Sequence, residues 1–134
     1  MKKKLFLMCL IGLLSITSAY AKCDGGREVK NSVGTTFCLS NVDMNWWSAA
    51  AWCRANGLHL ATMYEMCPSW DGNQGYGKCS ELNGAIDHQF TWAWSATANG
   101  SAYAFTVNLS SAWVMAATHD YNRTSDGYNY AFCR

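Results

Sequence analysis

The chain has 134 residues, of which 50% are hydrophobic and 14% aromatic, so it can fold as one packed domain and is too apolar to be intrinsically disordered. Lys and Arg number ten against nine Asp and Glu, giving a net charge of +1. No basic stripe or cationic amphipathic helix is visible, which argues against nucleic acid or a membrane surface as the partner. A two-domain enzyme is not expected at this length.

The first 21 residues have the pattern of a signal peptide. Three lysines follow Met1, an apolar run covers residues 5–16, and Ala-Tyr-Ala at 19–21 is a typical cleavage sequence. A transmembrane helix needs about 20 apolar residues, and this run is shorter. We therefore expect cleavage to leave a domain of residues 22–134 without a membrane anchor, secreted, periplasmic or at the cell surface.

Six cysteines lie in the expected mature domain. An even number in a small exported domain predicts three disulfides, although the count alone leaves 15 connectivities open. The lack of CxxC pairs and the scattered histidines argue against a zinc site. The six are Cys23, Cys38, Cys53, Cys67, Cys79 and Cys133.

The N-terminal part of the domain predicts a hairpin followed by a helix. Residues 29–39 contain two strand-like stretches around a turn at 31–34, and a Cys23–Cys38 disulfide would tie the preceding tail to the second strand. Asn45 is a good N-cap, and apolar residues recur at helical spacing as far as Cys53 before Gly57. Because Cys53 lies on the apolar face, a buried disulfide is expected there rather than a reactive thiol.

Short elements and a loop are predicted next. A brief helix or turn is expected from Thr62 towards Cys67, ended by Pro68. Residues 69–84 are rich in Gly, Asn, Asp and Ser, which is typical of a loop. A local Cys67–Cys79 disulfide is the simplest way to pin this loop.

The last third predicts a sheet, because apolar and polar residues alternate there with a period of two. Tight turns at 99–101 and 108–111 and a longer polar loop at 118–127 separate the strands. The expected strands cover residues 90–95, 102–107, 112–116 and 128–133. The fold class is therefore α+β, with small antiparallel sheets, one main amphipathic helix and a second short helix.

Several motifs resemble the C-type lectin-like domain. Met-Asn-Trp-Trp-Ser-Ala-Ala-Ala-Trp-Cys at 44–53 is similar to the family's aromatic-x-x-Ala-x-x-x-Cys helix, and Gly-Leu-His-Leu-Ala-Thr at 57–62 to its Gly-x-x-Leu-Ala strand. Residues 90–95 stand where the family has a Trp-Ile-Gly-Leu strand, and 130–134 match its last cysteine strand. The second half is more similar to compact bacterial members. This resemblance implies a Cys53–Cys133 disulfide.

The calcium and sugar motifs of that family do not occur in this sequence. Sugar-binding members carry a Glu-Pro-Asn or Gln-Pro-Asp triplet and a later Trp-Asn-Asp triplet, whereas the sole proline here is Pro68 and the strand reads Trp113-Val114-Met115. Residues 71–77 superficially suggest a calcium loop, yet Tyr76 stands where an EF-hand needs glycine. A solvated loop is therefore expected, with no metal and no cofactor.

No catalytic constellation is predicted. His119 and Asp120 are neighbours whose side chains would point apart, no Gly-x-Ser-x-Gly elbow occurs, and paired cysteines leave no thiolate nucleophile. The chain is therefore expected not to be an enzyme.

A ligand site is expected where loops meet at one end of the sheet. Trp113 follows a turn and would present an aromatic face, and the 118–127 loop holds a dense polar cluster able to bind sugar hydroxyls, carboxylates or peptide groups. The candidate contacts are Trp113, His119, Asp120, Tyr121, Asn122 and Arg123. They predict a module that binds a protein or glycan without calcium. The alternative is a structural or pilus-associated surface subunit that self-associates into an oligomer.

Overall fold

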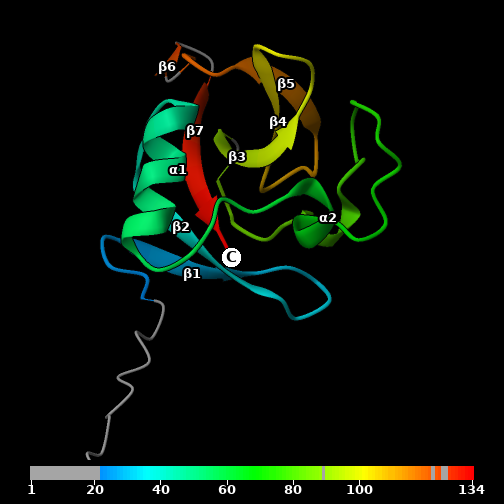
Figure 1. Cartoon of the computed structure of the whole chain (residues 1–134). Helices are drawn as coiled ribbons and strands as arrows, with labels where there is room; N and C mark the ends of the chain where they lie inside the picture. The colour runs from blue at the N-terminus through cyan, green and yellow to red at the C-terminus, as the bar shows by residue number, and fades with distance from the viewer. Residues whose placement is uncertain (1–21, 89, 122, 125–126) are drawn as a thin grey trace, which may run out of the picture.

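The computed structural model describes residues 22–88, 90–121, 123–124 and 127–134 (Figure 1). The expected signal peptide, residues 1–21, lies outside them. In chain order the elements are β1 (Gly26–Lys30), β2 (Thr36–Asp43), α1 (Trp46–Ala55), α2 (Met63–Met66), the 3-10 turn η1 (Ser80–Leu82), β3 (Thr91–Ala98), β4 (Tyr103–Asn108), β5 (Val114–Thr118), β6 (Arg123–Thr124) and β7 (Gly127–Cys133). The predicted α+β class is confirmed.

The strands form one sheet whose order differs from their order in the chain. The path is β1-β2-β7-β3-β4-β5, with β6 paired to β7. Neighbours are antiparallel except β3 and β7, which run parallel and place Trp92 opposite Asn129. The last strand of the chain is thus an inner strand that joins the β1–β2 hairpin to the β3–β4–β5 meander.

The predicted hairpin and helix are both present. The hairpin strands extend beyond the predicted 29–39, with Gly26 opposite Ser40. At the start of α1 the Asn45 side chain accepts a hydrogen bond from the Ser48 amide at 2.8 Å, and Gly57, with a φ of 72°, follows the helix end. The small buried residues Ala49 and Ala50 let the helix lie close to the sheet.

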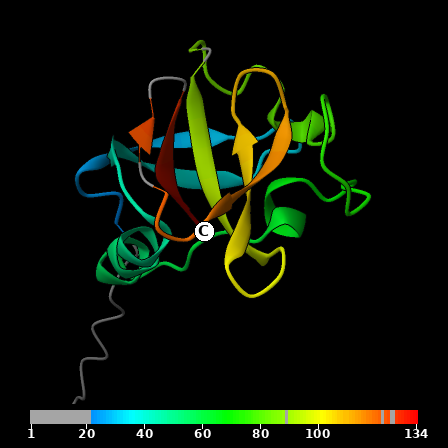
Figure 2. The ribbon, with the colours of Figure 1, turned by 90° about the horizontal axis from the view of Figure 1, so that it is seen from above.

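The two faces of the sheet pack against different elements. One face shares its core with α2 and the loop after it, through residues such as Phe37, Phe132 and Val107. The other face is covered by α1, which buries Trp94 and Ala131. Figure 2 shows α1 at the β7 side of the molecule, away from the ribbons of β4 and β5. On the α1 face, therefore, the β4–β5 side of the sheet has no helix above it.

All three predicted disulfides are confirmed. Cys23–Cys38 ties the N-terminal tail to β2, Cys53–Cys133 joins α1 to β7, and Cys67–Cys79 closes the loop after α2. Their sequence separations are 15, 80 and 12 residues, respectively. The longest of these loops fastens the main helix to the centre of the sheet.

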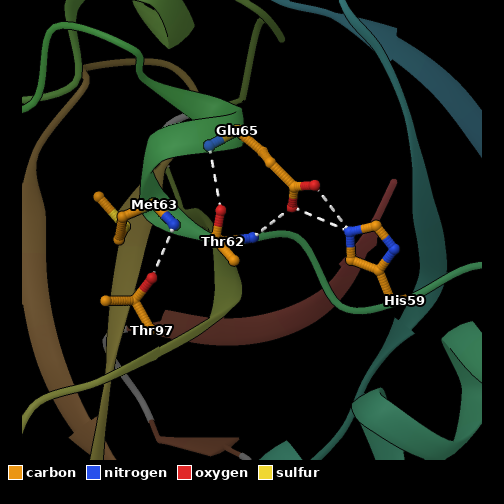
Figure 3. A network of polar contacts seen from close by, with 5 residues as sticks. All are labelled: His59, Thr62, Met63, Glu65 and Thr97. Atoms are coloured by element: carbon orange, nitrogen blue, oxygen red, sulfur yellow. Dashed lines mark hydrogen bonds and ion pairs between the residues drawn. The ribbon is translucent and has the colours of Figure 1, made fainter.

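The short helix α2 begins with a capping box (Figure 3). The Thr62 hydroxyl accepts from the Glu65 amide at 3.1 Å, while the Glu65 carboxylate accepts from the Thr62 amide at 2.8 Å and contacts His59 Nε2 at 2.8 Å. The Met63 amide donates to the Thr97 hydroxyl of β3 at 2.8 Å. These contacts fix α2 against the sheet and confirm the brief helix predicted after Thr62.

The capping carboxylate makes stability depend on pH. Burial alone would raise the pKa of Glu65, but hydrogen bonds from Thr62 and His59 outweigh it and hold the pKa below its ordinary 4.5. Since the folded state favours the charged form, this stabilisation exists above the ordinary pKa and disappears as pH falls through the lowered value. E65Q should therefore lower the free energy of unfolding by about 1 kcal/mol near neutral pH, allowing for partial exposure.

Urea unfolding at about pH 7 and about pH 2.5 measures this difference between E65Q and the wild-type chain. The difference should become smaller at the lower pH, because protonation of Glu65 removes the charge that the glutamine amide lacks. E28Q, which neutralises an exposed carboxylate on β1, is the matched control. An equal difference in unfolding free energy between E65Q and the wild-type chain at both pH values would contradict the role assigned to the Glu65 carboxylate.

Candidate ligand-binding groove

The sheet surface that α1 leaves uncovered forms a groove of about 600 Å³. Its lining comes from β3, β4, β5, β7 and the residues just before and just after β5, and none of the described lining residues is Asp, Glu, Lys, Arg or His. Four of them are aromatic: Trp92, Tyr103, Trp113 and Tyr121. Over the described residues, the groove lining is therefore aromatic and uncharged.

The turn before β5 places Trp113 at the groove. Asn108 Oδ1 accepts hydrogen bonds from the amides of Ser110 and Ser111 at 3.0 and 3.1 Å, and Ala112 adopts a φ of 57°. A left-handed alanine costs about 1 kcal/mol, which the surrounding hydrogen bonds must offset. Trp113 then lies 5.9 Å from Trp92 between ring centroids and remains 39% exposed.

Asn129 of β7 supplies an unpaired polar group at the groove. Its side chain is 3% exposed and lines the groove beside Trp92, its partner in the sheet register. The Nδ2 atom has no hydrogen-bond acceptor among the residues that the structure describes. A buried donor without an acceptor costs about 1–3 kcal/mol, so a ligand oxygen reaching it after a small side-chain shift would be stabilised.

The structure brings two of the six predicted contact residues to the groove, namely Trp113 and Tyr121. Asp120 is exposed just before Tyr121. Asn122 lies outside the described residues, and Arg123 is described only through its backbone, which pairs with β7. Trp113 and Tyr121 are therefore the predicted contact residues that the described groove lining contains.

His119 lies against α1 instead. Its ring is 4.8 Å from that of Trp46 and 5.2 Å from that of Trp47. Its carbonyl accepts from the Trp46 amide at 2.9 Å, and its amide donates to the Ala102 carbonyl at 3.0 Å. His119 thus positions the chain that leads into Tyr121.

Sequence reasoning did not select Trp92, Tyr103, Thr106 or Asn129, which also line the groove. Their alternation identifies a face of the sheet, as it does for Trp94, but does not show where a helix covers that face. The available signal was the pair of tryptophans, Trp92 and Trp94, on one face of a strand; the structure buries Trp94 with α1 and leaves Trp92 in the groove lining.

A second hollow of about 430 Å³ lies between the β1–β2 hairpin and the segment before β3. Its lining includes Arg27, Asp87 and His88, all exposed. The buried Ser40 hydroxyl in it donates to the Val42 carbonyl at 2.8 Å and accepts from the Ala131 amide at 2.9 Å. Because its buried hydroxyl is already satisfied, this hollow gives a weaker indication of a ligand than the groove.

The loop at 71–77 is held by its own contacts. Asp71 accepts from Lys78 Nζ at 2.8 Å and from the Asn73 amide at 3.0 Å, and these bonds lower the pKa of Asp71 to about 2. The carboxylate that would begin a calcium loop is thus paired with a lysine.

The calcium ion of sugar-binding C-type lectins does not fit the residues at the groove. Val114 is fully buried in the core that the sheet shares with α2, and Met115, which lines the groove, offers a thioether where a hard cation needs oxygen. Over residues 22–88, 90–121, 123–124 and 127–134, no three His, Cys, Asp or Glu side chains come together as a metal site. In the same part of the chain, no helix has the length and apolar character to cross a membrane.

Comparison with known proteins supports the family resemblance. No protein-family model matches the chain. A relative, "Salivary C-type lectin 1" of Aedes albopictus, is 39% identical over 59 residues, which are 44% of this chain and 33% of that protein. The chain thus matches about a third of the relative's length. Together with the α+β fold and three disulfides, this match supports a C-type lectin-like domain.

Proposed function

We propose that this protein is a secreted, non-enzymatic binding module that takes a neutral carbohydrate in the aromatic groove without calcium. The supporting observation is a groove lining that combines four aromatic side chains with the unpaired Nδ2 of Asn129. Aromatic rings pack against the C–H faces of sugar rings, and the amide donates to a sugar oxygen.

The uncharged lining argues for a neutral ligand. Within the groove, a carboxylated or sulfated sugar would lose its hydration without gaining a cationic partner among the described lining residues, which is unfavourable. A neutral sugar needs only hydrogen bonds, and Thr106, Tyr121 and Asn129 provide the polar groups. Asp120, Asn122 and Arg123 are proposed as rim contacts, because they adjoin Tyr121 in the chain.

The disulfides and the relative agree with an exported binding protein. Three disulfides in a small domain are typical of secreted proteins. The relative is named a salivary C-type lectin, and lectins bind sugars without converting them. Whether the chain is released or stays in the periplasm or at the cell surface depends on the export system of its host.

Replacing Trp113 by alanine should reduce sugar binding about tenfold or more, because it removes the central aromatic surface of the groove. The disulfide-bonded domain, residues 22–134, would be screened on a glycan array with calcium and with chelator. The affinity for the best glycan would then be measured by calorimetry. Binding is expected to survive chelation.

F90A is the control, because Phe90 is 51% exposed and does not line the groove. It should bind with wild-type affinity. An equal loss in F90A and W113A would contradict the location of the site. Binding abolished by chelator would contradict calcium independence.

A self-associating subunit is the second candidate, favoured by the exposed apolar surface at the groove, where Tyr103 and Met115 are 46% and 40% exposed. Sedimentation at increasing protein concentration tests whether the chain self-associates. A dimer that W113A dissociates, combined with an array that shows no binding, would favour self-association over sugar binding.

A further inference from the structure

The loop closed by Cys67–Cys79 is fastened to the groove at one edge of the sheet. Gly75 and Val114 of β5 exchange both backbone hydrogen bonds at 2.9 Å, and the Cys79 amide donates to the Ala112 carbonyl at 3.1 Å. Inside the loop, Trp70 packs against Phe105 at 4.8 Å and donates from Nε1 to the Asn73 carbonyl at 2.9 Å. The loop is therefore a fixed extension of the sheet edge.

This docking places Tyr76 beside Trp113. The two ring centroids are 5.1 Å apart, and Tyr76 is 72% exposed. Gly75 and Gly77 on either side have φ values of 137° and 67°, a backbone conformation that favours glycine. The aromatic side chain is thus held at the surface although it is not part of the groove lining.

Three rings therefore follow one another, from Tyr76 to Trp113 to Trp92. Trp113 contacts both of the others, at 5.1 and 5.9 Å, and no contact joins Tyr76 directly to Trp92. The row begins on the loop outside the groove and ends on β3 beside Asn129. Its ring spacing is close to the width of one sugar ring, so one sugar unit covers only part of the row.

We propose that the groove binds a linear, neutral, β-linked oligosaccharide along this row, with at least three sugar units in contact, rather than a single terminal sugar. The proposal rests on the carbohydrate-binding function proposed above. Successive rings of the row are tilted by 42° and 56°, so each can pack against the C–H face of a different sugar unit in a chain with equatorial β-linkages. Since the loop is already fixed by the disulfide and the sheet contacts, ordering it on binding costs little entropy.

Calorimetric titration of the disulfide-bonded domain with β-1,4-linked glucose and N-acetylglucosamine oligomers of increasing length tests this proposal. Affinity in the series that binds should rise from the single sugar to about the trisaccharide and then level off. Y76A should weaken binding of the longer oligomers about fivefold and leave the single sugar unchanged. Y76F, which keeps the ring, should restore the dependence on length.

F90A serves again as the control for loss of an exposed aromatic residue, and the intact mass of Y76A confirms that its disulfides have formed. Binding that does not vary with length, or a Y76A effect equal at every length, would overturn the extended site and leave the proposed function standing. If no oligomer of either series binds and the glycan array shows no binding, both the extended site and the proposed carbohydrate-binding function are overturned.

Discussion

Replacing Cys53 and Cys133 together by alanine should lower the free energy of unfolding by about 4.5 kcal/mol. The two residues are 80 positions apart, so their bond restricts the unfolded chain more than either other disulfide. Both side chains are fully buried between α1 and β7. Urea unfolding of the double variant measures the loss, which is comparable to the whole stability of many small domains.

The double variant of Cys67 and Cys79 is the control. Its bond spans only 12 residues, so the same chain-entropy argument gives a smaller loss of about 3 kcal/mol. The prediction is contradicted if the short loop costs as much as the long one. Because Cys67–Cys79 fixes the loop that carries Tyr76, this control should also weaken binding of long oligosaccharides.

Replacing Trp94 by alanine should cost about 4 kcal/mol of stability. Trp94 is the largest fully buried side chain among the described residues, and it packs in the core that α1 shares with the sheet. Its Nε1 donates to the Met44 carbonyl at 2.7 Å, just before the helix begins. The variant loses this bond and leaves a cavity beneath α1, which thermal or urea unfolding will detect.

The W94F variant separates the effect of the lost hydrogen bond from the effect of the cavity. Phenylalanine fills much of the space but cannot donate to Met44, so we expect a loss of about 1–2 kcal/mol. The surface variant F90A, at a position that is 51% exposed, should change stability by less than about 0.5 kcal/mol. A W94F variant as unstable as W94A would show that the hydrogen bond, and not packing, dominates at this position.

The helices and the short disulfide loop could be predicted because the sequence signals for each lie within the element itself or beside it. The Asn45 cap with its helical spacing identified α1, Pro68 marked the end of the brief helix or turn expected from Thr62, and loop composition suggested the Cys67–Cys79 pair. The strand order was not accessible in the same way. Alternation shows which face a residue occupies but not which strand lies beside it, so neither the parallel β3–β7 pair nor the inner place of β7 was predicted.

Of the residues that line the candidate site, only those outside the strands were predicted. Trp113 and Tyr121 followed from a turn and a polar loop, whereas Trp92 and Asn129 lie on strands. Trp92 and Trp94 are two residues apart on one face, yet Trp94 is fully buried and Trp92 lines the groove. That difference depends on where α1 ends above the sheet, which is a property of the tertiary packing.

The inner position of β7 has a consequence for biogenesis. Until residues 127–133 are available, the β1–β2 hairpin and the β3–β4–β5 meander are separate pieces, each with an open edge where β7 will pair. A chain that emerges N-terminus first would leave both edges exposed until β7 emerges, and during that time the edges could pair with other chains. The domain therefore completes its sheet only after β7 is available, and removal of residues 127–133 takes away the strand that unites its two halves.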